Sequence, residues 1–171
     1  LQQGFDEYLG LPYSNDMFGP AYRTAPPLPL YKNGVEVEEN PDQRLFTKRY
    51  TREAIAFIRK NKKNHFFLYY ANNFPHVPLF ASDEFRGKSK RGLYGDVVEE
   101  LDWSVGQILQ TLKDLKIDKQ TLVIFTSDNG PWIREKQEGG SAGLLYEGKG
   151  STYEGGMRVP AVFWWPGTIK P

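Results

Sequence analysis

The sequence has no cysteine, only two histidines and almost no net charge, and each shortage excludes a class of function. Without cysteine, these residues supply no disulfide, no thiolate-bound zinc and no cysteine nucleophile. His65 and His76 are too few for a histidine-rich metal site. The 22 lysine and arginine residues are balanced by 21 aspartate and glutamate residues, giving a net charge of +1, so no nucleic-acid partner is expected.

Long hydrophobic runs are also missing. No run approaches the roughly 20 apolar residues that a membrane-spanning helix needs, so no membrane span is expected. The 171 residues are enough for one domain with its own core, and the chain starts at Leu1 with neither an initiator methionine nor a signal peptide. We therefore expect it to be part of a longer protein.

Hydrophobic periodicity predicts an α/β arrangement. Residues 66–71 form a continuous apolar run, which is typical of a strand buried on both faces. Between Val97 and Leu115 apolar residues recur at steps of three and four, which predicts a long helix. A second buried strand is predicted over 121–126. This order of strand, helix and strand is typical of a right-handed crossover between parallel strands.

Further elements are predicted on either side of this unit. The first 46 residues look irregular apart from a tight hairpin turn at Asn33-Gly34, because both residues accept a positive φ. A helix capped by Thr51 is expected to run to about Lys60, and a third strand is expected over 159–165.

Polar residues follow the second predicted strand. Asp128 and Asn129 come directly after it, at the carboxyl end, where ligands bind in open α/β sheets. A carboxylate beside an amide oxygen suits Ca²⁺ or Mg²⁺, which prefer oxygen ligands. Two ligands do not complete a site, and Asp-Asn-Gly is also typical of a simple turn.

Two more candidates are a histidine and a lysine. His76 follows the first strand within a Pro-His-Val-Pro sequence and could donate to an anion or protonate a leaving group, although an ordinary surface-loop histidine fits the same pattern. Lys149 stands between two glycines and could bind an anion together with backbone N–H groups. The spacing is not that of a P-loop, and a flexible loop is the alternative.

The order of these motifs is more specific than any one of them. Asp128-Asn129-Gly130 is followed by the segment 143–161, which reads Gly-Leu-Leu-Tyr-Glu-Gly-Lys-Gly-Ser-Thr-Tyr-Glu-Gly-Gly-Met-Arg-Val-Pro-Ala. Upstream lie the segments 4–16 and 66–78 and the helix that contains Leu101-Asp102. Together these segments closely resemble the sulfatase family, in particular its arylsulfatase A-like and N-acetylgalactosamine-6-sulfatase-like members.

The resemblance implies an alkaline-phosphatase-like α/β fold, with a mixed, mostly parallel sheet flanked by helices, of which this chain is a partial domain. It also implies hydrolysis of sulfate esters by a formylglycine nucleophile, assisted by Ca²⁺ rather than Mg²⁺. By the matching motifs, Asp128 and Asn129 correspond to metal ligands. His76 and Lys149 correspond to catalytic and substrate-binding residues, and Ser14 corresponds to a polar substrate-binding residue.

Part of the family pattern has no counterpart in this sequence. Neither the nucleophile motif Cys/Ser-x-Pro-x-Arg nor the family's N-terminal pair of metal-binding aspartates is present. We therefore expect residues 1–171 to be the central part of a sulfatase catalytic domain, without the N-terminal nucleophile segment and the C-terminal subdomain, and inactive alone. Two alternatives stay open: a phosphodiesterase or phosphatase of the same superfamily, and a non-catalytic relative that binds sulfated ligands.

The resemblance also predicts partners and location. The expected substrate is a small-molecule or glycan sulfate ester, and the remainder of its own polypeptide is the other expected partner. Four aromatic residues could stack on sugar rings, although aromatic residues more often fill a core: Tyr13, Tyr22, Phe74 and Trp132. Export to the periplasm, cell surface or lysosome is expected, and the absence of cysteine favours a bacterial periplasm.

Overall fold

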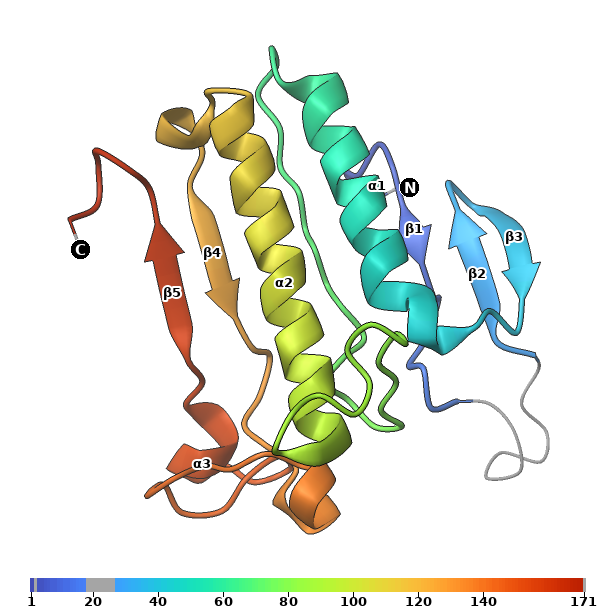
Figure 1. The fold of residues 1–171 in the computed structure, drawn as a ribbon, viewed down its shortest axis with the longest axis vertical. Helices are drawn as coiled ribbons and strands as arrows, with labels where there is room; N and C mark the ends of the chain where they lie inside the picture. Colours follow the sequence, from blue (N-terminus) through green and yellow to red (C-terminus); the bar gives the residue numbers. More distant parts are fainter. Residues whose placement is uncertain (2, 18–26, 171) are drawn as a thin grey trace.

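Two long helices form the centre of the fold (Figure 1). The structure is a computed structural model that describes residues 1, 3–17 and 27–170. Helix α1 spans Phe46–Asn61 and helix α2 spans Gly92–Asp114, and the two pack against each other. No helix among the described residues is both long and apolar enough to cross a membrane.

Buried hydroxyl groups join the two helices. Thr51 Oγ1 on α1 and Ser104 Oγ on α2 lie 2.6 Å apart, and the Tyr70 hydroxyl lies 2.9 Å from Ser104 Oγ. Thr51 and Ser104 are both buried. The three hydroxyls therefore satisfy one another within the helix interface, as buried polar groups must.

Both helices begin before the residues that the pattern indicated. α2 starts at Gly92 rather than Val97, and α1 starts at Phe46. The predicted cap at Thr51 is wrong, because Thr51 lies inside α1 and its hydroxyl donates to the Thr47 carbonyl at 2.6 Å. The capping side chain belongs instead to Asp42, which accepts from a backbone N–H of the short 3-10 helix Gln43–Leu45 that leads into α1.

The predicted first strand, 66–71, is extended but pairs with no strand among the described residues. Its side chains alternate in exposure. Phe66 and Tyr70 are half-buried against the helices, whereas Phe67 and Tyr69 are 73% and 71% exposed. The expectation of a strand buried on both faces is therefore wrong for the described chain, because the outward face is largely exposed, although the Phe5 ring lies 6.0 Å from that of Phe67.

A three-stranded antiparallel sheet lies beside α1 (Figure 1). It consists of β1 (Leu9–Gly10), β2 (Pro29–Lys32) and β3 (Val35–Glu39). The turn between β2 and β3 has positive φ at Asn33 and Gly34, which confirms the predicted hairpin. The first 46 residues are thus more regular than their composition indicated.

The predicted second and third strands are present, but their pairing differs from the expected crossover. β4 (Val123–Thr126) and β5 (Ala161–Trp164) form an antiparallel pair in which Val123 lies opposite Trp164. All strand pairs among the described residues are antiparallel, so the expected parallel pairing of 66–71 with 121–126 is wrong here. A crossover needs both strands in one sheet, and 66–71 joins no sheet among the described residues.

The core lies where α1 and α2 meet β2 and the loop after residue 70. Its buried apolar residues are Leu28, Leu30, Phe46, Tyr50, Phe74, Leu79, Ala81 and Val97. The remaining elements are two 3-10 helices, Asp118–Gln120 and Ile133–Glu138, and the short helix α3, Glu154–Met157. The segments between β4 and β5 gather beyond the carboxyl end of β4, at the lower end of Figure 1.

Candidate functional site

The loop that carries His76 is anchored to the core just before the histidine. Asn72 Oδ1 accepts a hydrogen bond from the Phe74 N–H at 3.0 Å, and the Phe74 ring is only 4% exposed. The Tyr50 hydroxyl donates to Asn73 Oδ1 at 2.8 Å. Burial raises the pKa of Tyr50 well above its usual range, so this hydroxyl keeps its proton and remains a donor. These contacts fix the backbone immediately before His76.

The imidazole of His76 is oriented by its own loop. Its Nδ1 lies 2.6 Å from the Val77 carbonyl oxygen, and a carbonyl can only accept, so Nδ1 is the protonated nitrogen. Nε2 is then the nitrogen that can accept a proton or, when protonated, donate one. The ring is half-buried. This arrangement suits a group that gives a proton to, or hydrogen-bonds, an anion beside it.

One indole ring contacts both His76 and Lys149. The ring centroids of His76 and Trp132 are 5.7 Å apart with a tilt of 43° between the planes. The ammonium nitrogen of Lys149 lies 5.2 Å from the centroid of the Trp132 ring, which is within the usual range of a cation–π contact. Two predicted site residues separated by 73 positions in the chain therefore meet at a third side chain.

Backbone contacts place Lys149 beside Trp132. The Lys149 N–H donates to the Pro131 carbonyl at 2.8 Å. A Cβ on the preceding residue, Gly148, would overlap this same carbonyl and also touch Ile133. Glycine is therefore needed at position 148 because the backbone passes directly against the segment 131–133.

The Glu-Gly-Gly sequence after Lys149 is explained in the same way. The Gly130 N–H donates to the Gly156 carbonyl at 2.9 Å, and the Gly155 N–H donates to the Tyr146 carbonyl at 2.9 Å. A Cβ at Gly155 would overlap the Glu147 carbonyl, and one at Gly130 would overlap Gly155. The glycine-rich segment is thus packed backbone against backbone onto the end of β4.

Asp128 and Asn129 lie between β4 and Trp132. Asp128 is exposed and Asn129 is half-buried, and the Ser127 hydroxyl donates to the Asn129 carbonyl at 3.0 Å. Adjacent carboxylate and amide oxygens fit a hard cation. Within residues 1, 3–17 and 27–170, however, no three His, Asp or Glu side chains come together as a metal site. Asp128 and Asn129 alone would provide too few ligands for such a cation.

Ser14 is exposed, and its segment is joined to the loop of His76 through Asn15. The buried Asn15 side chain donates to Gln43 Oε1 at 3.0 Å and to the Pro78 carbonyl at 3.4 Å. Among the described residues, no hydrogen bond links the Ser14 side chain itself to the other predicted site residues.

The aromatic residues expected to stack on sugars differ in their surroundings where the structure describes them. Phe74 is buried in the core, which is the alternative role open to these aromatic residues rather than sugar stacking. The Tyr13 hydroxyl donates to the Pro27 carbonyl at 3.2 Å, and Tyr22 lies outside the described residues. Trp132 is half-buried between His76 and Lys149, and no local sequence pattern indicated that role.

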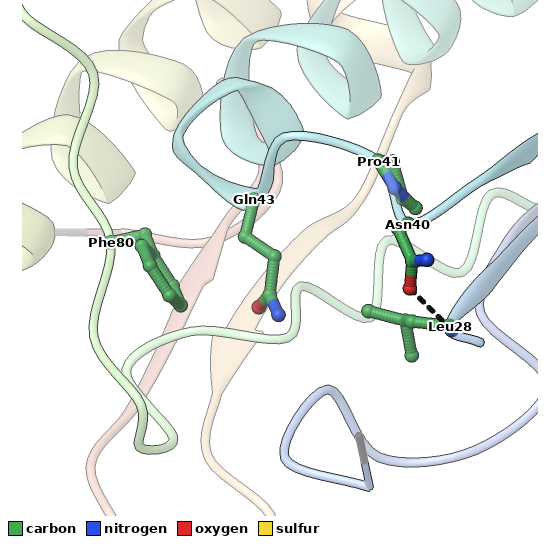
Figure 2. Close-up of a pocket in the computed structure, with 5 residues that line it drawn as sticks. All are labelled: Leu28, Asn40, Pro41, Gln43 and Phe80. Atoms are coloured by element: carbon green, nitrogen blue, oxygen red, sulfur yellow. Dashed lines mark hydrogen bonds between the residues drawn. The ribbon is translucent and has the colours of Figure 1, made fainter. Parts of the chain in front are cut away.

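A small pocket of about 180 Å³ has none of the predicted site residues in its lining (Figure 2). Leu28, Asn40, Pro41, Gln43 and Phe80 line it, and Asn40 Oδ1 accepts a hydrogen bond from the Leu28 N–H at 3.0 Å. Its lining contains no charged side chain. Asn40 and Gln43 are the residues of this lining with polar side chains.

Comparison with known proteins identifies relatives along the whole sequence. The sequence model of the family described as Sulfatase matches residues 2–171. N-acetylgalactosamine-6-sulfatase from Mus musculus is 47% identical over 182 residues, which covers 99% of this chain and 35% of that protein. Arylsulfatase A from Homo sapiens is 40% identical over 190 residues, covering 99% of this chain and 37% of that protein.

A solved structure resembles the chain as well. The crystal structure of Ps i-CgsB in complex with k-i-k-neocarrahexaose superimposes with a TM-score of 0.70 and 41% sequence identity. The similarity covers 81% of this chain and 31% of that one. The chain spans about a third of the length of the curated relatives it matches.

Proposed function

This chain belongs to the sulfatase family, and from that membership we propose that the protein containing it hydrolyses sulfate esters of sugars. The expected alkaline-phosphatase-like α/β fold is confirmed by the family match and by the similarity to solved structures. The proposal for the substrate is supported by a relative named for a sugar sulfate, N-acetylgalactosamine-6-sulfatase, and by a structural neighbour solved with a carrahexaose.

The observation that carries the proposal is the meeting of His76 and Lys149 at Trp132, next to the Asp128-Asn129 end of β4. A sulfate ester carries its negative charge on three oxygens. Its hydrolysis requires positive charge near those oxygens and a proton for the departing alcohol. Lys149 supplies an ammonium, and His76 supplies a ring nitrogen that can carry a proton.

In this proposal the two residues have separate roles. The Lys149 ammonium binds the sulfate oxygens and the oxygen that links sulfur to the sugar. As the bond between sulfur and that oxygen breaks, protonated Nε2 of His76 donates its proton to the oxygen, which leaves as the hydroxyl group of the sugar. Ser14 provides a further hydrogen bond to the sulfate.

The metal and the nucleophile are the other parts of the proposal. Asp128 and Asn129 would hold a Ca²⁺ ion in preference to Mg²⁺, and the bound ion would supply positive charge beside the sulfate oxygens. Because calcium takes six to eight oxygen ligands, further ligands come from other parts of the polypeptide. The nucleophile that accepts the sulfuryl group is expected to be a formylglycine, outside these residues.

We further propose that residues 1–171 are the central part of a catalytic domain and are inactive without the rest of the polypeptide. The preceding segment would contain a Cys/Ser-x-Pro-x-Arg motif and a pair of aspartates, and a smaller subdomain would follow. Reading the coding sequence upstream of Leu1 tests this directly. An upstream region without the motif would contradict the hydrolytic mechanism and favour a non-catalytic protein that binds sulfated ligands. The protein as a whole is proposed to be exported.

Activity is tested on the full-length protein. Release of inorganic sulfate is measured from N-acetylgalactosamine 6-sulfate and from a simple alkyl sulfate. The corresponding phosphate esters are assayed in parallel, and the rates of cleavage are compared. Lys149→Ala is expected to lower kcat about 100-fold or more, as loss of a group that stabilises transition-state charge does. Lys63→Ala, which removes an exposed lysine elsewhere, should leave kcat unchanged.

Faster cleavage of the phosphate esters would assign the protein to a phosphodiesterase or phosphatase branch. Binding of the sugar sulfate without release of sulfate would favour the non-catalytic alternative. Wild-type turnover in Lys149→Ala would contradict the role of Lys149.

A further inference from the structure

We propose that Trp132 is a positioning residue that holds the Lys149 ammonium and the His76 imidazole beside each other, an inference that rests on the proposed sulfatase function. The ring of Trp132 contacts both groups. Both distances, 5.2 Å to the Lys149 nitrogen and 5.7 Å to the His76 ring, lie within the ranges of favourable contacts with an aromatic ring.

The backbone of Trp132 is itself fixed. Its carbonyl accepts a hydrogen bond from the Glu135 N–H at 2.9 Å, in the first turn of the 3-10 helix Ile133–Glu138. A Cβ at Gly139 would overlap this carbonyl, so the end of the same short helix closes against it. The indole therefore projects from a well-packed turn, and contact with it can orient longer and more flexible side chains.

Lysine needs such a surface more than most residues do. Its ammonium is carried on a four-carbon stem with several rotatable bonds, so its position is poorly defined unless something contacts it. Within residues 1, 3–17 and 27–170, no carboxylate forms an ion pair with Lys149. The contact with the Trp132 ring is thus the interaction that orients its charge in the described part of the chain.

An aromatic ring is also chemically suited to this task. A carboxylate in the same place would neutralise the ammonium and repel a sulfate. A ring face attracts the ammonium without adding a negative charge, so the lysine remains able to bind an anion. The same ring limits the tilt of the imidazole, whose Nδ1 is already held by the Val77 carbonyl.

The alternative role for Trp132 is stacking on a sugar ring, and kinetics separate the two roles. A stacking residue contributes to binding of the sugar, so its loss raises KM for sugar sulfates and leaves a simple alkyl sulfate unaffected. A positioning residue acts on the groups that meet the sulfate itself. Its loss therefore lowers kcat for both substrates.

The experiment uses the full-length protein with Trp132→Phe and Trp132→Leu, each in the wild-type and Lys149→Ala backgrounds. Leucine fills part of the space but has no ring face, and phenylalanine retains one. We expect Trp132→Leu to lower kcat about tenfold for both substrates, and Trp132→Phe to stay within about threefold of wild type. In the Lys149→Ala background, Trp132→Leu should lower kcat by a clearly smaller factor, because one of the two positioned groups is gone.

Trp103 is half-buried on α2 against Phe85, and Trp103→Leu should lower the unfolding midpoint while kcat is unchanged. The inference is overturned if Trp132→Leu costs the same in both backgrounds, if Trp132→Phe is as impaired as Trp132→Leu, or if only KM for the sugar sulfate rises.

A binding measurement keeps the inference testable if the wild-type protein cleaves neither substrate. In that case the proposed function fails, and inorganic sulfate becomes the probe in calorimetric titrations of the same variants. Sulfate should bind to wild type and Trp132→Phe with similar affinity and more weakly to Trp132→Leu. Equal affinities in all three would contradict the positioning role of Trp132 independently of catalysis.

Discussion

Asn15 and Gln43 hold each other through two reciprocal hydrogen bonds inside the protein. Asn15 Nδ2 donates to Gln43 Oε1 at 3.0 Å, and Gln43 Nε2 donates to the Asn15 carbonyl at 3.2 Å. The two residues are 1% and 5% exposed. Because Asn15 Nδ2 also reaches the Pro78 carbonyl, this pair connects the segment of Ser14, the start of α1 and the loop of His76.

Replacing Asn15 by alanine should therefore destabilise the protein. We expect the free energy of unfolding to fall by about 1–3 kcal/mol, because buried Gln43 Oε1 and the Pro78 carbonyl lose the donor Asn15 Nδ2, although Gln43 Nε2 keeps the main-chain carbonyl of residue 15. The measurement is urea unfolding of the full-length protein. Asn64→Ala, at an exposed position, serves as the control and should change stability little. Equal stability of the two variants would show that the hydrogen bonds of Asn15 make no net contribution to the free energy of unfolding.

The backbone packing of the glycine-rich segment gives a second prediction. Gly155→Ala introduces a Cβ against the Glu147 carbonyl, so the backbone must shift, and we expect a loss of about 2 kcal/mol or more in stability. Gly106→Ala is the matched control, because it lies inside α2 with no atom within 4 Å of the added Cβ. That change should be neutral or stabilising by up to about 1 kcal/mol. Thermal unfolding of both variants decides the matter, and a neutral Gly155→Ala would contradict the close packing.

Asp96 predicts how stability depends on pH. Burial alone would raise the pKa of Asp96, but hydrogen bonds from the N–H groups of Ser89, Gly87 and Lys88 outweigh burial and hold its pKa below the usual value. A carboxyl group with a lowered pKa in the folded state stabilises the protein above its unfolded pKa, near 4. That contribution is lost as the pH falls through the folded-state pKa.

The variant Asp96→Asn tests this dependence. It should lower stability at pH 7 by about 1–3 kcal/mol and make unfolding less sensitive to acid below about pH 4. Urea unfolding at several pH values measures both effects. Asp102→Asn, exposed on the same helix, should change neither appreciably. If the stability of Asp96→Asn fell with decreasing pH as steeply as that of the wild type, other carboxyl groups would govern the stability in acid.

Metal binding gives a fourth prediction. In the full-length protein, Asp128→Ala is expected to lose calcium and activity together, because it removes the carboxylate of the proposed ligand pair. Calcium content is measured after dialysis against a chelator-free buffer, and Asp6→Ala, at an exposed position elsewhere, is the control. Unchanged calcium affinity in Asp128→Ala would refute the assignment of this ligand.

Local patterns predicted the elements that depend on local chemistry. Asn33-Gly34 gave the hairpin because its backbone preference is a property of those two residues. The helix around Leu101 followed from its periodicity. The start of α1 could not be predicted because a threonine hydroxyl can either cap the first turn of a helix or donate to the carbonyl four residues earlier. Packing against Ser104 decides between these two arrangements at Thr51.

Features that depend on contacts between distant segments could not be predicted from this sequence alone. The run 66–71 looks equally apolar on both faces, but in the described chain the side away from the helices is largely exposed. Motifs indicated Lys149 and His76 as candidates separately. Their meeting at Trp132 depends on two loops that pack together through backbone contacts, and no spacing in the sequence encodes that approach.

For protein engineering, the glycine-rich segment separates into positions to keep and positions to vary. Gly148, Gly155 and Gly156 form the frame of the loop, and side chains there would displace it. Leu144 and Tyr146, by contrast, project from the same loop and are largely exposed. A library that randomises these outward positions and leaves the glycines untouched would sample new contacts for a ligand while the scaffold that carries the lysine is preserved.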